Sequence, residues 1–120
     1  MIKNFKDLEI WQIGQEIAVE VYRLTKGFPQ NEIFGIIAQM RRSAVSIPSN
    51  IAEGYNRQYK TEFKQFLYIA LGSCAELETQ TIISKNLGYC KDIEYTTLSN
   101  KILKESRMIR SLTNKIVANN

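Results

Sequence analysis

Residues 7–26 of this chain read DLEIWQIGQEIAVEVYRLTK, and this stretch decides the class of fold. Its apolar side chains recur every three or four positions and form one stripe along a helix: Ile10, Ile13, Ile17, Val21 and Leu24. Asp7 is suited to accept a hydrogen bond from an early backbone N–H, and Gly27 is suited to the left-handed conformation that ends a helix. The pattern predicts an amphipathic helix over residues 7–26.

Glycines and prolines separate this helix from three further amphipathic segments. We predict helices over residues 32–55, 61–87 and 92–117, with Asn31 and Asp92 as N-caps and Gly88 just past the end of the third helix. None of these segments shows the alternating pattern of a strand. Amphipathic helices with short connections favour an antiparallel up-down-up-down four-helix bundle, with residues 1–120 as a single all-α domain.

Pro48 lies inside the second predicted helix and is the one local conflict with this pattern. A proline there deletes the hydrogen bond to the carbonyl of Ala44, at a cost of about 3 kcal/mol. The apolar stripe nevertheless keeps its phase on both sides of Pro48, at Ile47 and Ile51. We therefore expect one kinked helix rather than two separate helices.

The composition excludes several classes of protein. The 120 residues are 44% hydrophobic and 23% charged, which is ordinary for a globular domain. No apolar run approaches the ~20 residues of a membrane-spanning helix, and the first residues lack the apolar segment of a secretion signal. Cys74 and Cys90 match neither a disulfide framework nor a zinc-binding spacing. We expect a cytoplasmic protein with free thiols and no membrane contact.

The residues of an enzyme active site are missing from the sequence. The chain has no histidine, which removes the commonest general base and most zinc sites. Its six glycines are dispersed and form no phosphate-binding loop. Glu105 falls on the inward side of the fourth predicted helix, where its carboxylate needs an arginine partner or a place at the edge of the core. We expect no catalysis, no cofactor and no metal.

Basic side chains form two groups. The first lies on the outer face of the fourth predicted helix and contains Lys101, Lys104, Arg107, Arg110 and Lys115. The second surrounds the second and third predicted helices and contains Arg41, Arg42, Arg57, Lys60 and Lys64. With a net charge of +4, these groups are either solvated faces or sites for nucleic-acid phosphates. No aromatic stacking platform accompanies them in the sequence, so base-specific reading is not expected.

The second and third predicted helices carry more than one face that can be buried. A polar line on the back of the second helix is flanked by small residues, and the third helix has a second apolar side. The residues concerned are Arg42, Ser46, Ser49 and Glu53 on the second helix, and Ile69, Gly72 and Ile83 on the third. These faces are either solvated or an interface between copies of the chain.

Several sequence blocks carry a family resemblance. The most specific is SIPSNIAEG at residues 46–54, preceded by QMRRSA at residues 39–44 and by DLEIWQ at residues 7–12. Further blocks follow in residues 62–80, and LGY closes the match at residues 87–89. These blocks resemble a family of bacterial four-helix-bundle proteins encoded in intervening sequences of 23S ribosomal RNA genes.

The resemblance implies a four-helix bundle that assembles into a homopentameric ring. It also implies similarity to the accessory variability proteins of diversity-generating retroelements, which partner a reverse transcriptase and have a basic, nucleic-acid-binding surface. Within the family motif, Pro48, Ser49, Asn50 and Glu53 would shape and pack the second helix rather than perform chemistry.

Two functional hypotheses remain open at this point. The first is a non-enzymatic oligomeric module that binds the backbone of RNA or DNA through its basic patches. The second is a protein-interaction scaffold or accessory subunit, for example of a reverse transcriptase, without direct binding of nucleic acid. A nucleic-acid-binding measurement at two salt concentrations separates the two.

Overall fold

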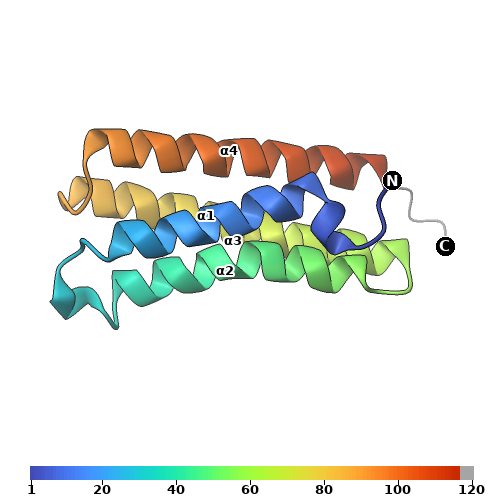
Figure 1. Ribbon diagram of the computed structural model, residues 1–120, viewed down its shortest axis with the longest axis horizontal. Helices are drawn as coiled ribbons and strands as arrows, with labels where there is room; N and C mark the ends of the chain where they lie inside the picture. The colour runs from blue at the N-terminus through green and yellow to red at the C-terminus, as the bar shows by residue number, and fades with distance from the viewer. Residues whose placement is uncertain (117–120) are drawn as a thin grey trace.

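A computed structural model describes residues 1–116 as a bundle of four long helices (Figure 1). Their bounds are Glu9–Thr25 for α1, Ile36–Tyr55 for α2, Lys60–Asn86 for α3 and Asp92–Lys115 for α4. Short 3-10 helices precede the first two, η1 at Phe5–Asp7 and η2 at Gln30–Glu32. Consecutive long helices run in opposite directions along a body of 48 × 24 × 22 Å. The predicted all-α four-helix bundle is confirmed.

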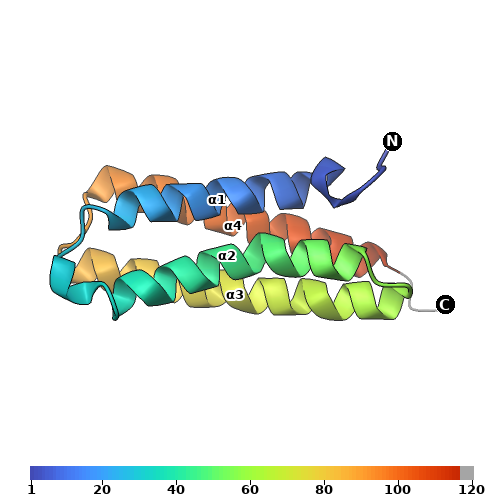
Figure 2. The same ribbon diagram turned by 60° about the horizontal axis from the view of Figure 1, so that its bottom comes forward.

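Each helix lies beside two others, as Figures 1 and 2 show together. Helix α1 packs against α2 and α4, and α3 also packs against α2 and α4. Helices α2 and α4 therefore face each other diagonally across the core and present their outer faces on different sides of the molecule. The α2–α3 pair has the most extensive packing of the four.

The start and end of α1 differ from the prediction. Asn4 caps η1, and Asp7 belongs to that turn, where its carboxylate accepts the backbone N–H of Lys3 at 2.8 Å. Leu8, with extended backbone, takes the N-cap position of α1. Among the described residues only Gly88 has a positive φ, so Gly27 does not end α1 in the left-handed conformation. Instead, the N–H of Gly27 bonds the carbonyl of Leu24 at 3.2 Å, which tightens the last turn.

Helix α2 begins at Ile36, later than predicted, because the chain first forms η2 and a turn. Asn31 lies inside η2, so its predicted role as N-cap is wrong, and Gly35 occupies that position. A Cβ at Gly35 would lie 2.5 Å from Oε1 of Glu32, so the close approach of that carboxylate favours glycine. Farther along, α2 continues through Pro48, which confirms the prediction of one helix rather than two.

Helix α3 begins one residue before its predicted start, and α4 begins at its predicted start. Gly88 follows α3 with a φ of 78°, which confirms its predicted place past the end of that helix. Lys91 rather than Asp92 is the N-cap of α4, and its backbone N–H donates to Oε1 of Glu94 at 2.8 Å. Asp92 is thus the first helical residue, where the helix dipole stabilises its negative charge. The predicted end at residue 117 lies outside the described residues.

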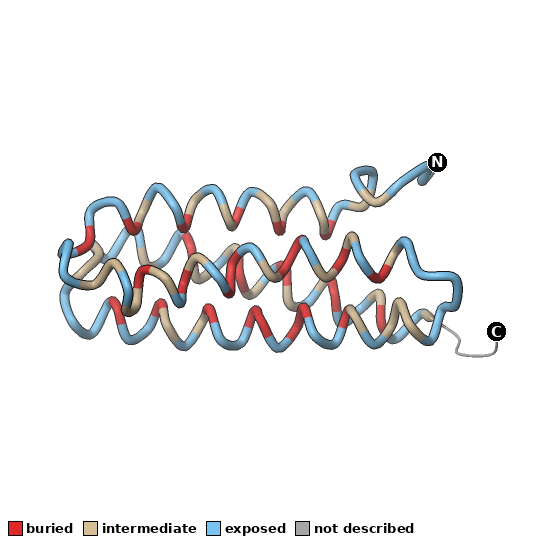
Figure 3. Tube along the Cα trace, turned by 90° about the horizontal axis from the view of Figure 1, so that it is seen from below, coloured by how far each residue is buried: buried red, intermediate tan, exposed pale blue. Residues whose placement is uncertain are grey.

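The predicted apolar stripes form the core. Figure 3 shows the buried positions on the sides where the helices face one another. Each helix contributes completely buried side chains, among them Ile17, Met40, Leu67 and Ile102. Burial of one such side chain stabilises the fold by about 1.5–3 kcal/mol. The second apolar side of α3 is different, because Ile69, Ile83 and Leu87 remain exposed.

Two contacts bring α2 and α3 close together. A Cβ added at Gly54 would lie 2.6 Å from the Cβ of Phe66, so only glycine lets the helices approach this closely. Farther along α2, the hydroxyls of Ser46 and Ser73 are hydrogen-bonded at 2.8 Å. The two helices are thereby fixed relative to each other along their length.

Within residues 1–116, no helix has the length and apolar composition that crossing a bilayer requires.

Candidate nucleic-acid interface

The outer face of α4 carries the first predicted basic group. Lys104, Arg107, Arg110 and Lys115 are all exposed. The acidic residues of α4 lie elsewhere, because Asp92 and Glu94 are in the first turn and Glu105 is buried. At a rise of 1.5 Å per residue, the four cations extend over about 16 Å. The face is therefore a strip of positive charge without an exposed carboxylate on α4 beside it.

Lys101 is separated from this strip. Its Nζ lies 3.0 Å from Oε1 of Glu20 on α1, and the Lys101 side chain is 41% exposed. The α1–α4 packing turns Lys101 toward α1, where a carboxylate partly neutralises it. Four of the five predicted cations of α4 thus remain on the outward strip.

The second predicted basic group does not form one patch. Arg41 and Arg42 lie in the first half of α2, about 24 Å along the helix from Arg57. Arg57 pairs with Glu53 at 3.1 Å on an exposed surface, and its guanidinium lies 4.9 Å from the ring centroid of Phe66. An exposed pair of this kind is worth little, about 0–1 kcal/mol, so it can open toward a phosphate. Lys60 and Lys64 lie at the same end of the bundle, in the first turns of α3.

Arg41 is held in place by α1. Its Nε donates to the hydroxyl of Thr25 at 3.0 Å, and its Nη2 donates to the carbonyl of Tyr22 at 3.5 Å. The guanidinium also lies 4.6 Å from the centroid of the Tyr22 ring, within cation–π range. The side chain therefore has little remaining conformational entropy to lose when it binds a ligand.

A groove between α1 and α2 brings Arg41 together with residues that the sequence did not connect with it. The groove has a volume of about 710 Å³ and is lined by Tyr22, Ile33, Phe34, Ile37, Ala38, Arg41, Arg42, Val45 and Ser46. Phe34 is 94% exposed, and no carboxylate lines the groove. The sequence predicts no aromatic stacking platform beside the basic residues, yet α1 and the turn before α2 bring Tyr22 and Phe34 into this groove.

Sequence reasoning missed Phe34, although one signal pointed to it. At 100° per residue, Phe34 falls outside the stripe formed by Ile33, Ile37 and Met40. A large aromatic residue off the stripe is either exposed or part of an interface.

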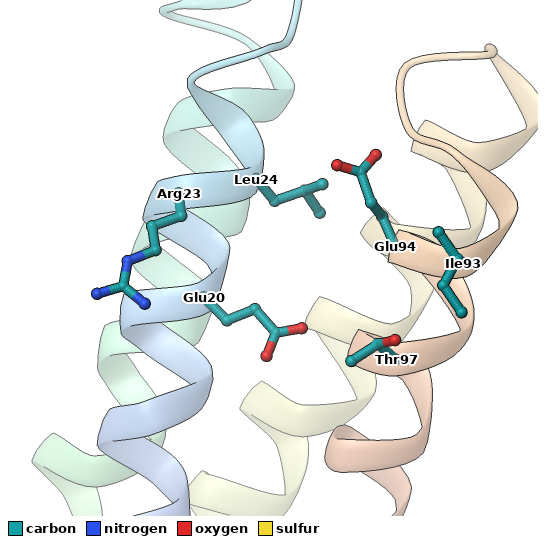
Figure 4. A pocket seen from close by; sticks show the side chains of 6 residues that line it. All are labelled: Glu20, Arg23, Leu24, Ile93, Glu94 and Thr97. Atoms are coloured by element: carbon teal, nitrogen blue, oxygen red, sulfur yellow. The ribbon is translucent and has the colours of Figure 1, made fainter.

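A second pocket, of about 310 Å³, lies between α1 and α4 (Figure 4). The carboxylates of Glu20 and Glu94 extend toward its opening from the two helices, whereas Arg23 points away. Leu24, Ile93 and Thr97 complete the lining. Because two carboxylates repel phosphate, this pocket is not part of a nucleic-acid surface.

The residues of the predicted self-association surface have different environments. Arg42, Ser49, Glu53, Ile69, Gly72 and Ile83 are exposed. Ser46 differs, because its hydroxyl bonds Ser73 and accepts from Nδ2 of Asn50 at 2.8 Å. Ser46 therefore helps to hold α2 against α3 within one chain. Glu53 is paired with Arg57 of the same chain.

Glu105 is completely buried, and neither of its predicted environments exists. Within the described residues its two carboxylate oxygens have no hydrogen-bond partner, and it does not lie at the edge of the core. Burial raises its pKa to about 8, and the charge of Glu9 contributes to the rise. At neutral pH the side chain is therefore mainly the uncharged acid, which removes most of the penalty of burial.

Burial raises the pKa of both cysteine thiols above the ordinary value. Cys74 and Cys90 are free, and burial raises the pKa of Cys74 to about 12, so it remains a thiol at neutral pH. In the part of the chain that the structure describes, no group of three or more potential ligands could hold a metal ion.

The fold is similar to a solved structure from Bacteroides thetaiotaomicron, described as a protein with unknown function from the S23 ribosomal protein family. The two structures superpose with a TM-score of 0.80 at 23% sequence identity, over 88% of this chain and 99% of the other. At that identity the likeness shows the fold alone. No curated protein matches this chain. The model of the 23S rRNA-intervening sequence protein family matches residues 6–111, and the chain belongs to that family.

Proposed function

We propose that this protein is a non-enzymatic, oligomeric module that binds the backbone of RNA or DNA. The observation that carries the proposal is the strip of exposed cations on α4: Lys104, Arg107, Arg110 and Lys115. Successive members three residues apart are separated by about 4.5 Å along the helix, which is comparable to the spacing of phosphates along a strand. Such a strip contacts phosphates without reading bases.

Self-association strengthens this proposal. We propose a homopentameric ring, as the family resemblance implies, with subunits joined through Ser49 and Glu53 of α2 and the outer side of α3. The exposed apolar side chains of Ile69 and Ile83 and the small residue Gly72 support this surface. A ring repeats the α4 strip around the assembly and raises the positive field that attracts a polyanion.

The experiment is charge reversal of the strip. The triple variant Lys104→Glu, Arg107→Glu and Arg110→Glu removes the central cations, which are exposed and make no ion pair within the described residues. A control triple variant, Lys3→Glu, Arg23→Glu and Lys26→Glu, changes the net charge equally at exposed positions outside α4. Fluorescence anisotropy with labelled structured RNA and duplex DNA measures binding at low and near-physiological salt.

We expect the parent to bind with a steep salt dependence, with a log–log slope of about −3 to −4 if four phosphates are neutralised. The α4 variant loses at least tenfold more affinity than the control and keeps its sedimentation mass. Equal losses in the two variants would mean that net charge, and not the α4 strip, determines binding. Absence of binding by the parent at low salt would refute the proposal.

One observation favours a second function, a scaffold or accessory subunit without direct nucleic-acid contact. Large apolar side chains that are 40–56% accessible lie in two groups on α3 and at its end: Tyr68 and Ile69 in its first half, and Ile82, Ile83 and Leu87 at its C-terminal end. Exposed apolar groups of this kind are suited to a protein partner. Similarity to accessory variability proteins would make a reverse transcriptase a candidate partner. Failure of the parent to bind nucleic acid, together with an intact oligomer, would favour this function.

A further inference from the structure

The turn that carries Phe34 is held in an ordered conformation. The N–H of Gly35 bonds the carbonyl of Glu32 at 2.9 Å, and the hydroxyl of Tyr89 donates to Oε2 of Glu32 at 2.8 Å. The Tyr89 ring in turn packs on the buried Phe28, with centroids 5.4 Å apart. The turn before α2 and the α3–α4 connection lie at the same end of the bundle (Figure 1), and the Tyr89–Glu32 bond ties them together. This turn therefore holds the backbone that carries the exposed Phe34.

An aromatic ring displayed in this way is expected to have a ligand. Full burial of a phenylalanine side chain is worth about 1.5–3 kcal/mol, and Phe34, at 94% exposure, gains almost none of it within one chain. A ring held by an ordered turn also loses little conformational freedom when it stacks on a flat partner.

The charges beside the ring restrict the chemistry of that ligand. Arg41 and Arg42 line the same groove as Phe34, and no carboxylate is among the lining residues. The Glu32 carboxylate of the turn is bonded to the Tyr89 hydroxyl. Arg42 is exposed and forms no ion pair within the described residues. A ligand that fits has a flat π-face and a negative charge a short distance away. A two-fold contact of this groove with a second copy of itself would instead set arginines against arginines.

We propose that the α1–α2 groove is a binding site for a single strand of nucleic acid, with one unstacked base on Phe34 and the neighbouring phosphates on Arg41 and Arg42. A base supplies the π-face and its backbone supplies the charge. A duplex does not fit, because its bases are stacked on each other. The site is separate from the α4 strip, since α2 and α4 lie diagonally across the bundle. This inference rests on the proposed binding of nucleic acid.

The test compares a labelled oligothymidine of about 15 nucleotides, a length suited to one single-strand site, with a duplex of the same length. Phe34→Leu keeps an apolar side chain but removes the π-face, and Phe34→Trp keeps a π-face. Because Phe34 is almost completely exposed, neither change disturbs the core. Tyr59→Leu is the matched control, since Tyr59 is a 47% exposed aromatic residue just before α3, outside the groove.

We expect Phe34→Leu to weaken oligothymidine binding about tenfold and to leave duplex binding unchanged. Phe34→Trp should retain the affinity, and its fluorescence should be quenched when oligothymidine binds. Arg42→Gln should reduce the salt slope for oligothymidine by about 0.7, the value for one phosphate contact on a single strand. Tyr59→Leu should behave as the parent.

Other results would overturn the proposal in distinguishable ways. If the parent binds nucleic acid and Phe34→Leu binds oligothymidine equally well, the groove is not the site, although the proposed function stands. If Phe34→Leu lowers the sedimentation mass and reduces the affinity for oligothymidine and for the duplex equally, the groove is an interface between subunits. If the parent binds neither ligand at low salt, this inference and the proposed function both fail.

Discussion

Glu105 of α4 lies directly against Gly14 of α1 in the core, so that a Cβ on Gly14 would be 3.0 Å from Oε2 of Glu105. The other near neighbours of that position are Ile47 and Pro48 of α2. The carboxyl group is thus enclosed by several helices without a hydrogen-bond partner in the described residues. This arrangement determines how the stability of the bundle should respond to pH and to mutation.

The stability of the fold should decrease as pH rises toward 8. The pKa of Glu105 is raised from 4.5 to about 8 in the folded chain, so between these values the folded state holds a proton that the unfolded state has released. In that window the free energy of unfolding falls by about 1.4 kcal/mol per pH unit, and the loss levels off above the folded pKa. Urea denaturation of the parent and of Glu105→Gln at several pH values checks this.

Glutamine at position 105 is uncharged at every pH. The free energy of unfolding of the Glu105→Gln variant should therefore rise steadily relative to that of the parent from pH 5 to pH 8. A constant offset between the two unfolding curves over that range would mean that Glu105 does not titrate in the folded state as described.

Gly14→Ala should destabilise the protein by about 1 kcal/mol. Alanine in place of glycine inside a helix gains up to about 1 kcal/mol, but overpacking of a core costs about 1–3 kcal/mol. The new methyl group would lie 3.0 Å from Oε2 of Glu105, which is enclosed in the core and has little room to shift because Ile47 and Pro48 already lie at contact distance from the same position, so we expect overpacking to prevail. Thermal and urea unfolding measure the change, and an increase in stability would show that Glu105 can move aside.

Gly54→Ala should be more damaging, with a loss of about 3 kcal/mol. The added Cβ would lie 2.6 Å from the Cβ of Phe66 and 3.3 Å from the carbonyl oxygen of Phe63, so the α2 and α3 backbones must separate. Gly72→Ala is the matched control, because nothing lies within 4 Å of a Cβ there.

That control should gain about 0.5–1 kcal/mol from helix propensity alone. If the Gly54 and Gly72 variants unfold at the same urea concentration, close approach at Gly54 does not determine the α2–α3 packing.

Tyr89→Phe should destabilise the fold, because it removes one hydrogen bond without changing the ring. The lost bond joins the Tyr89 hydroxyl to Glu32 at 2.8 Å and connects the two loops at one end of the bundle. Tyr59→Phe serves as the control, because Tyr59 is exposed and its hydroxyl has no bond within the described residues. Hydrogen exchange should also speed up at Gly35, whose amide belongs to the turn that Glu32 holds. Equal exchange rates in the two variants would exclude a role for Tyr89 in ordering that turn.

The sequence was most informative about the helices and least informative about the pairing of side chains. The stripe from Ile10 to Leu24 and the left-handed Gly88 were correctly predicted, because each depends on a few neighbouring residues. The N-cap at Asn31 was wrong, since a competing turn with its own hydrogen bonds forms before α2. The basic residues of α4 were correctly placed on an outer face, except that α1 supplies a carboxylate to Lys101.

The sequence by itself determined four amphipathic helices, the breaks between them and a surplus of cations on α4. These properties follow from backbone geometry within about one or two helical turns, which periodicity and helix-ending residues encode directly. Only the tertiary structure decided that Glu105 has no partner, that Arg41 rests on Tyr22, and that Phe34 stands exposed beside Arg42. Such contacts depend on the rotation and shift of each helix against its neighbours. Side-chain packing across the whole core sets that rotation and shift.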